Sequence, residues 1–590
     1  MRYILAKQLL MVNLLRTKRF SLKMFFHGIQ KFSLFVMLTW VPIEKAHEVR
    51  KPHILFVIVD DFGWGDIGYH REKPTPEVLT PTMNDLATKE GVILNRHYVH
   101  MACTPSRSAF QTGRLPVHVV TKLCDPCDIN GAIPRNMTGI ASKLKEAGYD
   151  THVVGKWDVG MTTPTHTPEG RGYDTSLAFY SHGNWAYTSV AWGGSTNNRD
   201  TIPTDPYVSS DLIVDLWDTG KPANDLNGTM HEEYLFRDRM LSIIRNHDPE
   251  TPLFLNYNSK LIHYPLQAPK EYQDKFSFIP QDNRRMYHAM VNLLDDQLAN
   301  ITEEFKAAGL WENTIMVLTS DNGGYVLAED GPCNTTEWTD DIKQDVGKGT
   351  ACFNGETGAN NYPLRGGKYS NFEGGIRVNA FVSGGYLPKS VLGTTINEPI
   401  HIADWYGTFC SMADIDPFDK VADESNLPPV DSVNVWPLLS GRNQTSPRQN
   451  FLVKRGLYIS GEWKYVAGGT EMIEANWGGP IYPNQTTVDD PIDNYSFKCP
   501  SQGCLFNIVN DVEERFEVSA EHPYIVDQLK EEMKQAQESI WSEPHGKDPE
   551  CEIAAREMYG GFYGPWKELE NENEDYVIDQ EVQVEIEIIY

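Results

Sequence analysis

Two stretches of the chain combine a continuous apolar run with polar side chains directly after it. His53–Val59 is rich in β-branched residues and precedes Asp60–Asp61, while Asn313–Thr319 precedes Asp321–Asn322 by one serine. Runs of this kind are typical of strands that a parallel sheet buries on both faces. Ligands and reactive groups collect at the carboxyl ends of such strands. The two runs therefore predict an α/β fold with a functional site at one edge of its sheet.

Further segments fit the same fold. Thr151–Val154 and Pro252–Tyr257 are short apolar runs that predict two more strands, and Thr138–Ala147 carries apolar residues at helical spacing. Residues 284–308 predict a long helix, because apolar side chains recur there every three or four positions. We expect these helices to cover the sheet.

The pattern changes near residue 450. Short alternating runs at 451–454, 457–460 and 463–466 predict a small antiparallel sheet, and a helix is expected near Tyr524–Trp541. Beyond that helix the chain ends in a strongly acidic segment, which is typical of a solvated tail.

A chain of 590 residues is long enough for a large core and two domains. We expect four parts: a signal peptide or signal anchor at 1–46, a main domain at 52–450, a C-terminal subdomain at 451–566 and an acidic tail at 567–590.

The charge of the chain limits its partners. The formal net charge of −29 argues against nucleic acid or an anionic membrane surface as a partner. An anionic ligand is compatible with this charge only if its site supplies cations of its own.

The N-terminal region suggests the secretory pathway. Phe32–Ile43 is an apolar run of twelve residues after Lys31, too short to span a bilayer and suited to the core of a signal peptide. A signal anchor is the alternative, and Met24 is an alternative start because residues 1–23 are unusually basic. Seven N-x-S/T sequons fit a secreted or lysosomal protein: Asn136, Asn227, Asn300, Asn334, Asn443, Asn484 and Asn494.

One motif is specific to a known family. Cys103–Arg107 reads C-T-P-S-R and is followed by T-G-R at Thr112–Arg114. This spacing of cysteine, proline and arginine resembles the signature of the type I sulfatases. In that family a formylglycine-generating enzyme of the endoplasmic reticulum oxidises the cysteine to formylglycine, whose hydrated aldehyde is the nucleophile. Outside the family, the segment would be a buried cysteine in a turn, with Pro105 holding Thr104 extended.

The resemblance covers residues 52–545. It implies an alkaline-phosphatase-like sandwich, with a large, mostly parallel central sheet flanked by helices and a smaller C-terminal domain with an antiparallel sheet and a helix. It also implies one calcium ion, with magnesium as the alternative, on oxygen ligands that suit a hard cation. The implied ligands are Asp60, Asp61, Asp321, Asn322 and the converted Cys103. The resemblance assigns sulfate, nucleophile or leaving-group contacts to Arg107, Lys156, His263 and Lys368.

One position departs from the family. Gly155–Gly160 reads G-K-W-D-V-G, where the family has G-K-W-H-L-G, so Asp158 replaces a histidine that contacts the formylglycine hydroxyl. A carboxylate about 4–5 Å from a bound sulfate would cost on the order of 3–4 kcal/mol at an effective dielectric near 20. We therefore expect Asp158 to weaken the release of sulfate without abolishing it.

The nine cysteines are odd in number, which in a secreted chain indicates one special thiol. If Cys103 is converted, the other eight can form four disulfides. Cys124-x-x-Cys127 is also compatible with zinc or redox chemistry, but a second such pair at ligand spacing is missing from the sequence, and structural disulfides are favoured.

The sequence therefore predicts a sulfuric ester hydrolase that acts on an aryl or sugar sulfate. The amino-acid sequences of Asp60–His70 and Arg365–Gly375 resemble those of the arylsulfatase B branch. That branch acts on N-acetylgalactosamine 4-sulfate ends of glycosaminoglycans. Two alternatives stay open: a sulfated-glycan-binding protein made weak or inactive by Asp158, and a phosphoesterase of the wider superfamily. The second would need a further metal cluster and a Ser or Thr nucleophile. We expect no stable membrane span.

Overall fold

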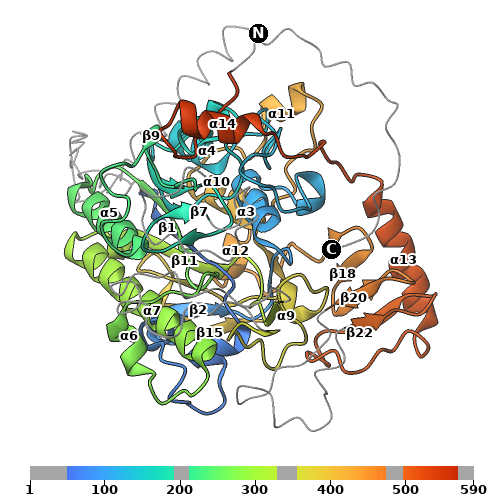
Figure 1. Ribbon diagram of the computed structural model, residues 1–590. Coiled ribbons are helices and arrows are strands. Elements are labelled where there is room, and N and C mark those ends of the chain that lie inside the picture. Colours follow the sequence, from blue (N-terminus) through green and yellow to red (C-terminus); the bar gives the residue numbers. More distant parts are fainter. Residues whose placement is uncertain (1–49, 192–211, 329–354, 474–495, 569–590) are drawn as a thin grey trace, which may run out of the picture. The chain divides into compact units, whose positions relative to one another are not determined.

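The computed structural model describes residues 50–191, 212–328, 355–473 and 496–568 (Figure 1). The expected signal segment, nearly all of the acidic tail, Cys333, Cys352 and three of the sequons lie outside the described residues. The contacts divide the chain into two units, Met1–Lys51 and Pro52–Tyr590, and nearly all described residues belong to the second.

The centre of this unit is a large sheet, and its middle is parallel. Within the described residues ten strands form it, in the order β15-β2-β14-β11-β1-β10-β4-β5-β8-β9. The five middle strands run parallel to one another. They are β11 (Thr314–Ser320), β1 (His53–Val59), β10 (Leu253–Asn258), β4 (Asp150–Lys156) and β5 (Thr175–Phe179). The carboxyl ends of these strands therefore meet at one edge.

The outer strands complete the sheet on both sides. β14 and β2 pair antiparallel beyond β11, and β8 and β9 pair antiparallel beyond β5. Their bounds are β2 (Gly91–Leu94), β14 (Ala380–Ser383), β15 (Thr394–Ile396), β8 (Trp217–Asp218) and β9 (Lys221–Pro222).

The two faces of β1 belong to different cores. Ile54, Phe56 and Ile58 join one hydrophobic cluster, and the alternate residues Leu55 and Val57 join another. This division follows from the two-residue period of a strand. Because helices cover both clusters, every side chain of β1 is buried, as the continuous apolar run predicts.

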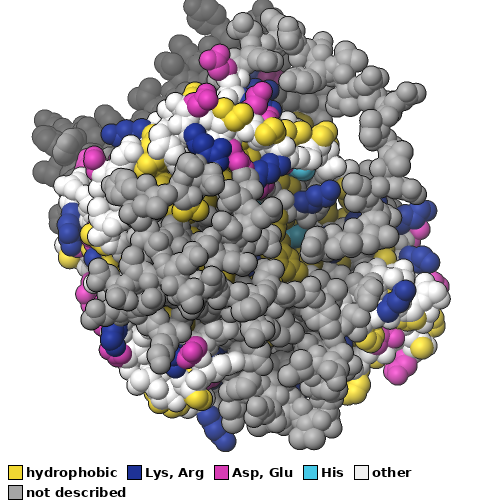
Figure 2. Space-filling view, viewed as in Figure 1, with side chains coloured by type: hydrophobic (Ala, Val, Ile, Leu, Met, Phe, Trp, Pro, Cys, Tyr) yellow, Lys and Arg dark blue, Asp and Glu magenta, His cyan; other side chains and the backbone are white. Residues whose placement is uncertain are grey.

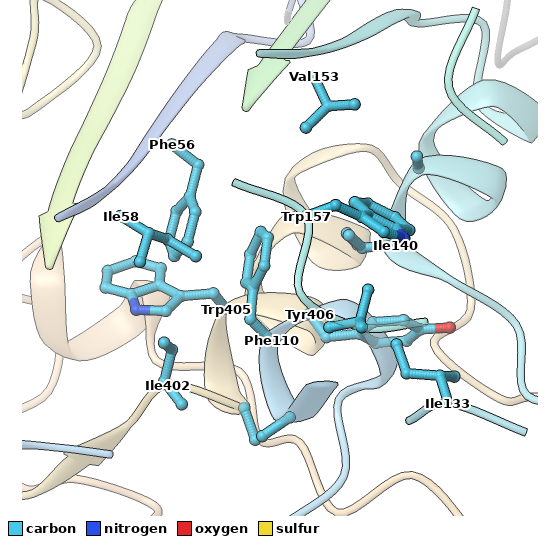
Figure 3. Packing of buried hydrophobic residues seen from close by; sticks show 14 of the residues in the cluster. Phe56, Ile58, Phe110, Ile133, Ile140, Val153, Trp157, Ile402, Trp405 and Tyr406 are labelled. Carbon is cyan, nitrogen blue, oxygen red and sulfur yellow. The ribbon is translucent and has the colours of Figure 1, made fainter. Parts of the chain in front are cut away.

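Three helices pack on the first face: α3 (Cys103–Thr112), α4 (Ile140–Glu146) and α10 (Asp404–Met412). Figure 3 shows Phe56 of β1 beside Phe110 of α3, with Trp405 of α10 next to them; the two phenylalanine rings stack at 3.9 Å. This contact fixes α3 against the sheet, and α3 begins at Cys103.

The other face is covered by α2 (Pro81–Thr88), α5 (Glu232–Asn246) and α7 (Asp282–Ala307). The helix predicted at 284–308 is therefore confirmed, with a start two residues earlier. The smaller elements are α6 (Lys270–Lys275), α9 (Glu373–Ile376), α11 (Lys420–Glu424), α12 (Trp436–Leu439), β3 (His97–Tyr98), β6 (Asn184–Trp185), β7 (Val190–Ala191), β12 (Leu327–Ala328), β13 (Gly355–Glu356), β16 (Ile400–His401), β20 (Glu471–Ile473) and β21 (Ser496–Lys498).

The C-terminal part contains the expected antiparallel sheet. Its strands are β17 (Asn450–Lys454), β18 (Leu457–Ser460), β19 (Trp463–Val466) and β22 (Cys504–Asn507), hydrogen-bonded in that order. Helix α13 (Pro523–Gln537) packs on this sheet through Val526, Leu529 and Met533, which recur every three or four residues. Main-domain residues, among them Tyr98, Val117 and Phe372, belong to the same hydrophobic cluster.

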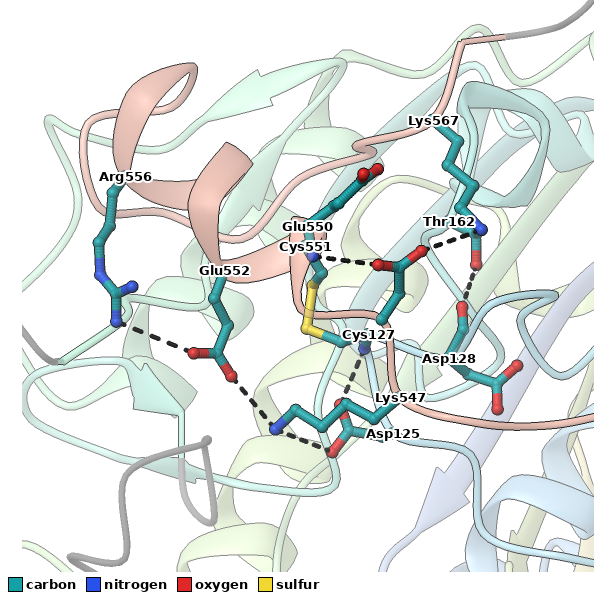
Figure 4. The surroundings of a disulfide bond; sticks show 11 residues. Asp125, Cys127, Asp128, Thr162, Lys547, Glu550, Cys551, Glu552, Arg556 and Lys567 are labelled. Carbon is teal, nitrogen blue, oxygen red and sulfur yellow. Dashed lines mark hydrogen bonds and ion pairs between the residues drawn. A yellow bond between two sulfur atoms is a disulfide. The ribbon is translucent and has the colours of Figure 1, made fainter.

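The chain then returns to the main domain. Helix α14 (Glu550–Glu557) carries Cys551, which is disulfide-bonded to Cys127 (Figure 4). Phe562 forms a bridge with Val214 of the main domain. The predicted boundaries at 450 and 566 stay a prediction, but the segment around α14 shares the core of the first domain.

The expectation of four disulfides is wrong. Cys124 and Cys410 are buried free thiols, while Cys127 pairs with Cys551 and Cys499 pairs with Cys504. Cys410 lies in α10 inside the hydrophobic core, and the sulfur of Cys124 lies 3.7 Å from Nδ1 of His545. Parity alone could not identify buried thiols that face apolar or imidazole groups. Among the described residues, no helix is long and apolar enough to cross a membrane.

Removal of the Cys127–Cys551 disulfide should destabilise the protein strongly. The bond joins positions 424 residues apart, so Cys127→Ala/Cys551→Ala should lower the free energy of unfolding by about 2–5 kcal/mol. Cys499→Ala/Cys504→Ala, which opens a bond across five positions, should cost less and is the matched control. Denaturant unfolding of both pairs checks this, and an equal loss in the two would contradict it.

Candidate active site

Three carboxylates are buried together at the carboxyl edge of the parallel strands. Asp60 and Asp61 follow β1, Asp321 follows the neighbouring β11, and carboxylate oxygens of the three lie within 4.8 Å of one another. Burial raises the pKa of Asp60, and it raises the pKa of Asp321 to about 6. Groups of this kind need positive charge beside them.

Each carboxylate has a buried cationic partner. Nζ of Lys156 lies 2.7 Å from Oδ2 of Asp60, and Nζ of Lys368 lies 2.7 Å from Oδ1 of Asp61. The guanidinium of Arg107 lies 2.8 Å from Oδ2 of Asp321. Lys156 ends β4, Arg107 belongs to α3 and Lys368 precedes α9. Segments that are far apart in the sequence therefore supply one cluster of charges.

Cys103 is the first residue of α3 and faces this cluster. Its sulfur, a carboxylate oxygen of Asp60 and a ring nitrogen of His263 lie within 4.8 Å of one another. Thr104 is helical, so the alternative of a turn with an extended Thr104 is wrong. Burial raises the pKa of the Cys103 thiol to about 12. The unmodified thiol is therefore protonated and a poor nucleophile.

The oxygen ligands suit a hard divalent cation. Oδ1 of Asp60 and Oδ1 of Asn322 are buried, and neither accepts a hydrogen bond from the described residues. The amide of Asn322 is oriented by its Nδ2, which donates to Oδ1 of Asp61 at 2.7 Å. Buried oxygens without donors are what calcium or magnesium coordinates. The residues present therefore fit the metal that the sequence predicts.

His263 is a further residue close to Asp61. Its Nδ1 faces the carbonyl of Tyr264, and its Nε2 lies 3.8 Å from Oδ2 of Asp61. Burial lowers the pKa of this imidazole well below its ordinary value, and Lys368 and Lys156 lower it further. His263 therefore belongs to the same cluster as the predicted metal ligands.

Asp158 is fully buried at the end of β4, where its backbone has a φ of 52°. The hydroxyl of Thr104 donates to its Oδ1 at 3.1 Å, and Nδ1 of His182 lies 2.9 Å from the same oxygen. Burial would raise the pKa of Asp158, but the neighbouring His182 and Lys156 outweigh it, and the pKa is lowered. Asp158 is therefore a partnered carboxylate.

His182 is the site residue that sequence reasoning missed. It follows β5, which is parallel to β4, and therefore lies at the same edge of the sheet as Asp60 and Asp321. A ring nitrogen of His182, the sulfur of Cys103 and an oxygen of Asp158 lie within 4.8 Å of one another. The strand-end rule could have indicated His182, but the run Thr175–Phe179 is too short and mixed to be recognised as a strand.

The site is rich in charge although the chain is acidic. Among the described residues it holds the carboxylates of Asp60, Asp61, Asp158 and Asp321 against three cationic side chains. A divalent cation would make the cluster net positive and able to bind an anion. On the face in Figure 2 the lysines and arginines are scattered among acidic side chains.

A small cavity adjoins the carboxylates. Asp61 and Thr357 line it together with the rings of Tyr264, Tyr287 and Tyr325. Aromatic side chains beside a charged centre can pack against the ring of an organic substrate.

Solved structures of two other proteins have this fold. Ps i-CgsB, solved in complex with k-i-k-neocarrahexaose, matches with a TM-score of 0.62 at 24% identity over 87% of this chain and 98% of that one. PsFucS1 sulfatase from Pseudoalteromonas sp. matches with a TM-score of 0.59 at 21% identity over 84% and 92%. They confirm the alkaline-phosphatase-like architecture.

Sequence comparisons agree with the architecture. Arylsulfatase J of Mus musculus is 30% identical over 548 residues, which cover 88% of this chain and 81% of that protein. N-acetylgalactosamine-6-sulfatase of Homo sapiens is 26% identical over 408 residues, 68% of each protein. The profile of the Sulfatase family matches residues 52–415. The chain thus belongs to the sulfatase family, enzymes that hydrolyse sulfate esters.

Proposed function

We propose that this sulfatase cleaves an aryl or sugar sulfate with a formylglycine made from Cys103. The observation that carries the proposal is the position of Cys103 at the start of α3, within 4.8 Å of Asp60 and His263. Burial raises the pKa of the Cys103 thiol, which disfavours the thiolate that a cysteine nucleophile would need. Conversion to formylglycine supplies a hydrated aldehyde whose hydroxyl can attack sulfur.

The proposed metal is one calcium ion, with magnesium as the alternative. Asp60, Asp61, Asp321 and Asn322 would hold it together with the converted residue 103, because their oxygens converge and two of them lack donors among the described residues. A cation bound there supplies positive charge to the sulfate oxygens and favours ionisation of the nucleophile.

The chain supplies the remaining charge and protons. Arg107, Lys156 and Lys368 are buried cations that can stabilise charge on the sulfate oxygens as the sulfur is attacked. His263 or Lys368 would give a proton to the leaving alcohol, since a nitrogen of each lies within 3.8 Å of a carboxylate oxygen of Asp61.

The substrate class is narrowed by the cavity and by the relatives. Tyr264 and Tyr325 are among the residues that line the small cavity next to Asp61, and aromatic side chains can pack against a sugar or an aryl group. The related N-acetylgalactosamine-6-sulfatase is named for a sulfated sugar. We propose a sulfated carbohydrate as the substrate, with N-acetylgalactosamine 4-sulfate, the substrate of the arylsulfatase B branch, as the first to test.

The proposed location is the secretory pathway, followed by the lysosome or the extracellular space. The sequon residues Asn136, Asn300 and Asn443 are exposed, as glycan acceptors must be. Two disulfides suit an oxidising compartment. The formylglycine-generating enzyme of the endoplasmic reticulum would then be the partner during maturation.

Protein from a secretory host should carry formylglycine at position 103. Mass analysis of the tryptic peptide should show conversion, and the same sample should release sulfate from an aryl sulfate. Cys103→Ser should remain folded and lose at least a hundredfold in kcat, because its hydroxyl cannot form an aldehyde hydrate. Only unmodified Cys103 in an active sample would overturn the proposal.

The metal should depend on Asp321. Elemental analysis should find calcium or magnesium and no stoichiometric zinc, because the ligands are oxygens. Asp321→Ala should lose metal and activity together. Asp295→Asn is the matched control, since Asp295 is a buried carboxylate that accepts from backbone N–H groups of α2, away from the cluster. Bound zinc, or metal retained by Asp321→Ala, would show the assignment to be wrong.

A further inference from the structure

The pair formed by Asp158 and His182 has the geometry of a proton acceptor and its orienting carboxylate. Nδ1 of His182 lies 2.9 Å from Oδ1 of Asp158, so the neutral imidazole donates through Nδ1 and keeps the lone pair of Nε2. The Asp158 side chain is fully buried, and the His182 side chain is 24% exposed. The carboxylate is thus enclosed by protein, whereas part of the imidazole is accessible to solvent.

Several contacts hold Asp158 in place. The hydroxyl of Thr104, next to Cys103 on α3, donates to Oδ1 at 3.1 Å. Nζ of Lys156 lies 3.6 Å from Oδ2. Asp158 is therefore tied both to the helix that carries the nucleophile and to a cation of the site.

The turn that carries His182 is also fixed. The backbone N–H groups of Tyr180 and Ser181 donate to the two oxygens of Asp215 at 2.8 and 2.7 Å. A Cβ at Gly183 would lie 2.9 Å from Nδ1 of His263, so the turn packs directly against the other histidine of the site. The position of His182 next to Cys103 is thus set by buried contacts on both sides.

We propose that His182, oriented by Asp158, supplies at residue 103 the imidazole that the family has at position 158. This inference rests on the proposed function. A ring nitrogen of His182 lies within 4.8 Å of the Cys103 sulfur. Asp158 is then a positioning residue. The imidazole then comes from the turn after β5 instead of the segment after β4.

The chemistry assigned to His182 is the removal of one proton. When sulfate leaves residue 103, the imidazole of His182 takes the proton of the remaining hydroxyl. The electron pair of that O–H bond becomes the second carbon–oxygen bond of the aldehyde as the carbon–oxygen bond to sulfate breaks. The imidazolium then gives the proton to water, and water adds to the aldehyde to restore the hydrate.

Asp158 alone is poorly suited to this task. Nζ of Lys156 lies 3.6 Å from its Oδ2, and a cation at that distance favours the ionised carboxylate, so Asp158 holds a proton weakly. Its oxygens already face Thr104, His182 and Lys156. A neutral imidazole is the better acceptor near neutral pH.

Kinetics should separate this role from a structural one. His182→Ala should lower kcat for an aryl sulfate by about a hundredfold with little change in KM. In His182→Gly, added imidazole should restore part of the loss, because the exposed side of the residue admits a small base. His118→Ala is the matched control, since His118 pairs with Asp431 at 2.8 Å outside the site and its loss should leave kcat unchanged.

The position of the imidazole can be tested directly. Asp158→His should lower kcat by breaking the pair, whereas Asp158→His in the His182→Ala background should recover part of the activity. Asp158→Asn should give a smaller loss than His182→Ala. A rise in kcat for Asp158→His alone would mean that Asp158 slows the reaction instead of positioning His182, and would overturn the inference.

The pair can also be observed without turnover. In Cys103→Ala protein, the Nδ1 proton of His182 should give a resonance downfield of the amides that disappears in His182→Ala and in Asp158→Asn. Absence of that resonance would overturn the pairing. A wild-type protein that hydrolyses aryl sulfate while His182→Ala keeps full kcat would refute this inference and leave the proposed function standing. Lack of formylglycine and of turnover in wild type would refute both.

Discussion

The buried carboxylates of Asp60, Asp61 and Asp321 impose the strongest physical requirement on this structure. A charge removed from water costs several kcal/mol unless another charge or a set of hydrogen bonds compensates for it. Lys156, Lys368 and Arg107 supply that compensation here at 2.7–2.8 Å. The cluster therefore holds together only if five segments of the chain reach one edge of the sheet.

The parallel sheet meets this requirement. β11, β1, β10 and β4 are neighbours in that order and end at one edge, so Lys156 meets Asp60 across 96 positions and Asn322 meets Asp61 across 261. The stacking of Phe56 and Phe110 fixes α3 on the sheet, and this helix brings Cys103 and Arg107 to the same place. Hydrophobic packing on the faces of the sheet thus determines which charged side chains meet at the carboxyl ends of its strands.

The effect of replacing the family histidine by Asp158 depends on the side chains around this carboxylate. By itself, a carboxylate near a bound anion is unfavourable. In the folded protein His182, Thr104 and Lys156 surround it, and its charge orients an imidazole. The alternative of a protein that only binds sulfated glycans was based on the replacement of the family histidine by Asp158, and the membership of the chain in the sulfatase family does not favour it.

The sequence by itself determined the elements that obey local rules. The apolar runs gave β1, β10 and β11, helical spacing gave α7, and the Cys103 motif indicated the family, because each signal lies within a few adjacent residues. It could not reveal the cysteine pairing or His182. Cys127 meets Cys551 across 424 positions, and His182 meets Asp158 only because β4 and β5 are neighbours in the sheet. Contacts between distant segments depend on how strands are ordered in space, and that is decided only by the tertiary fold.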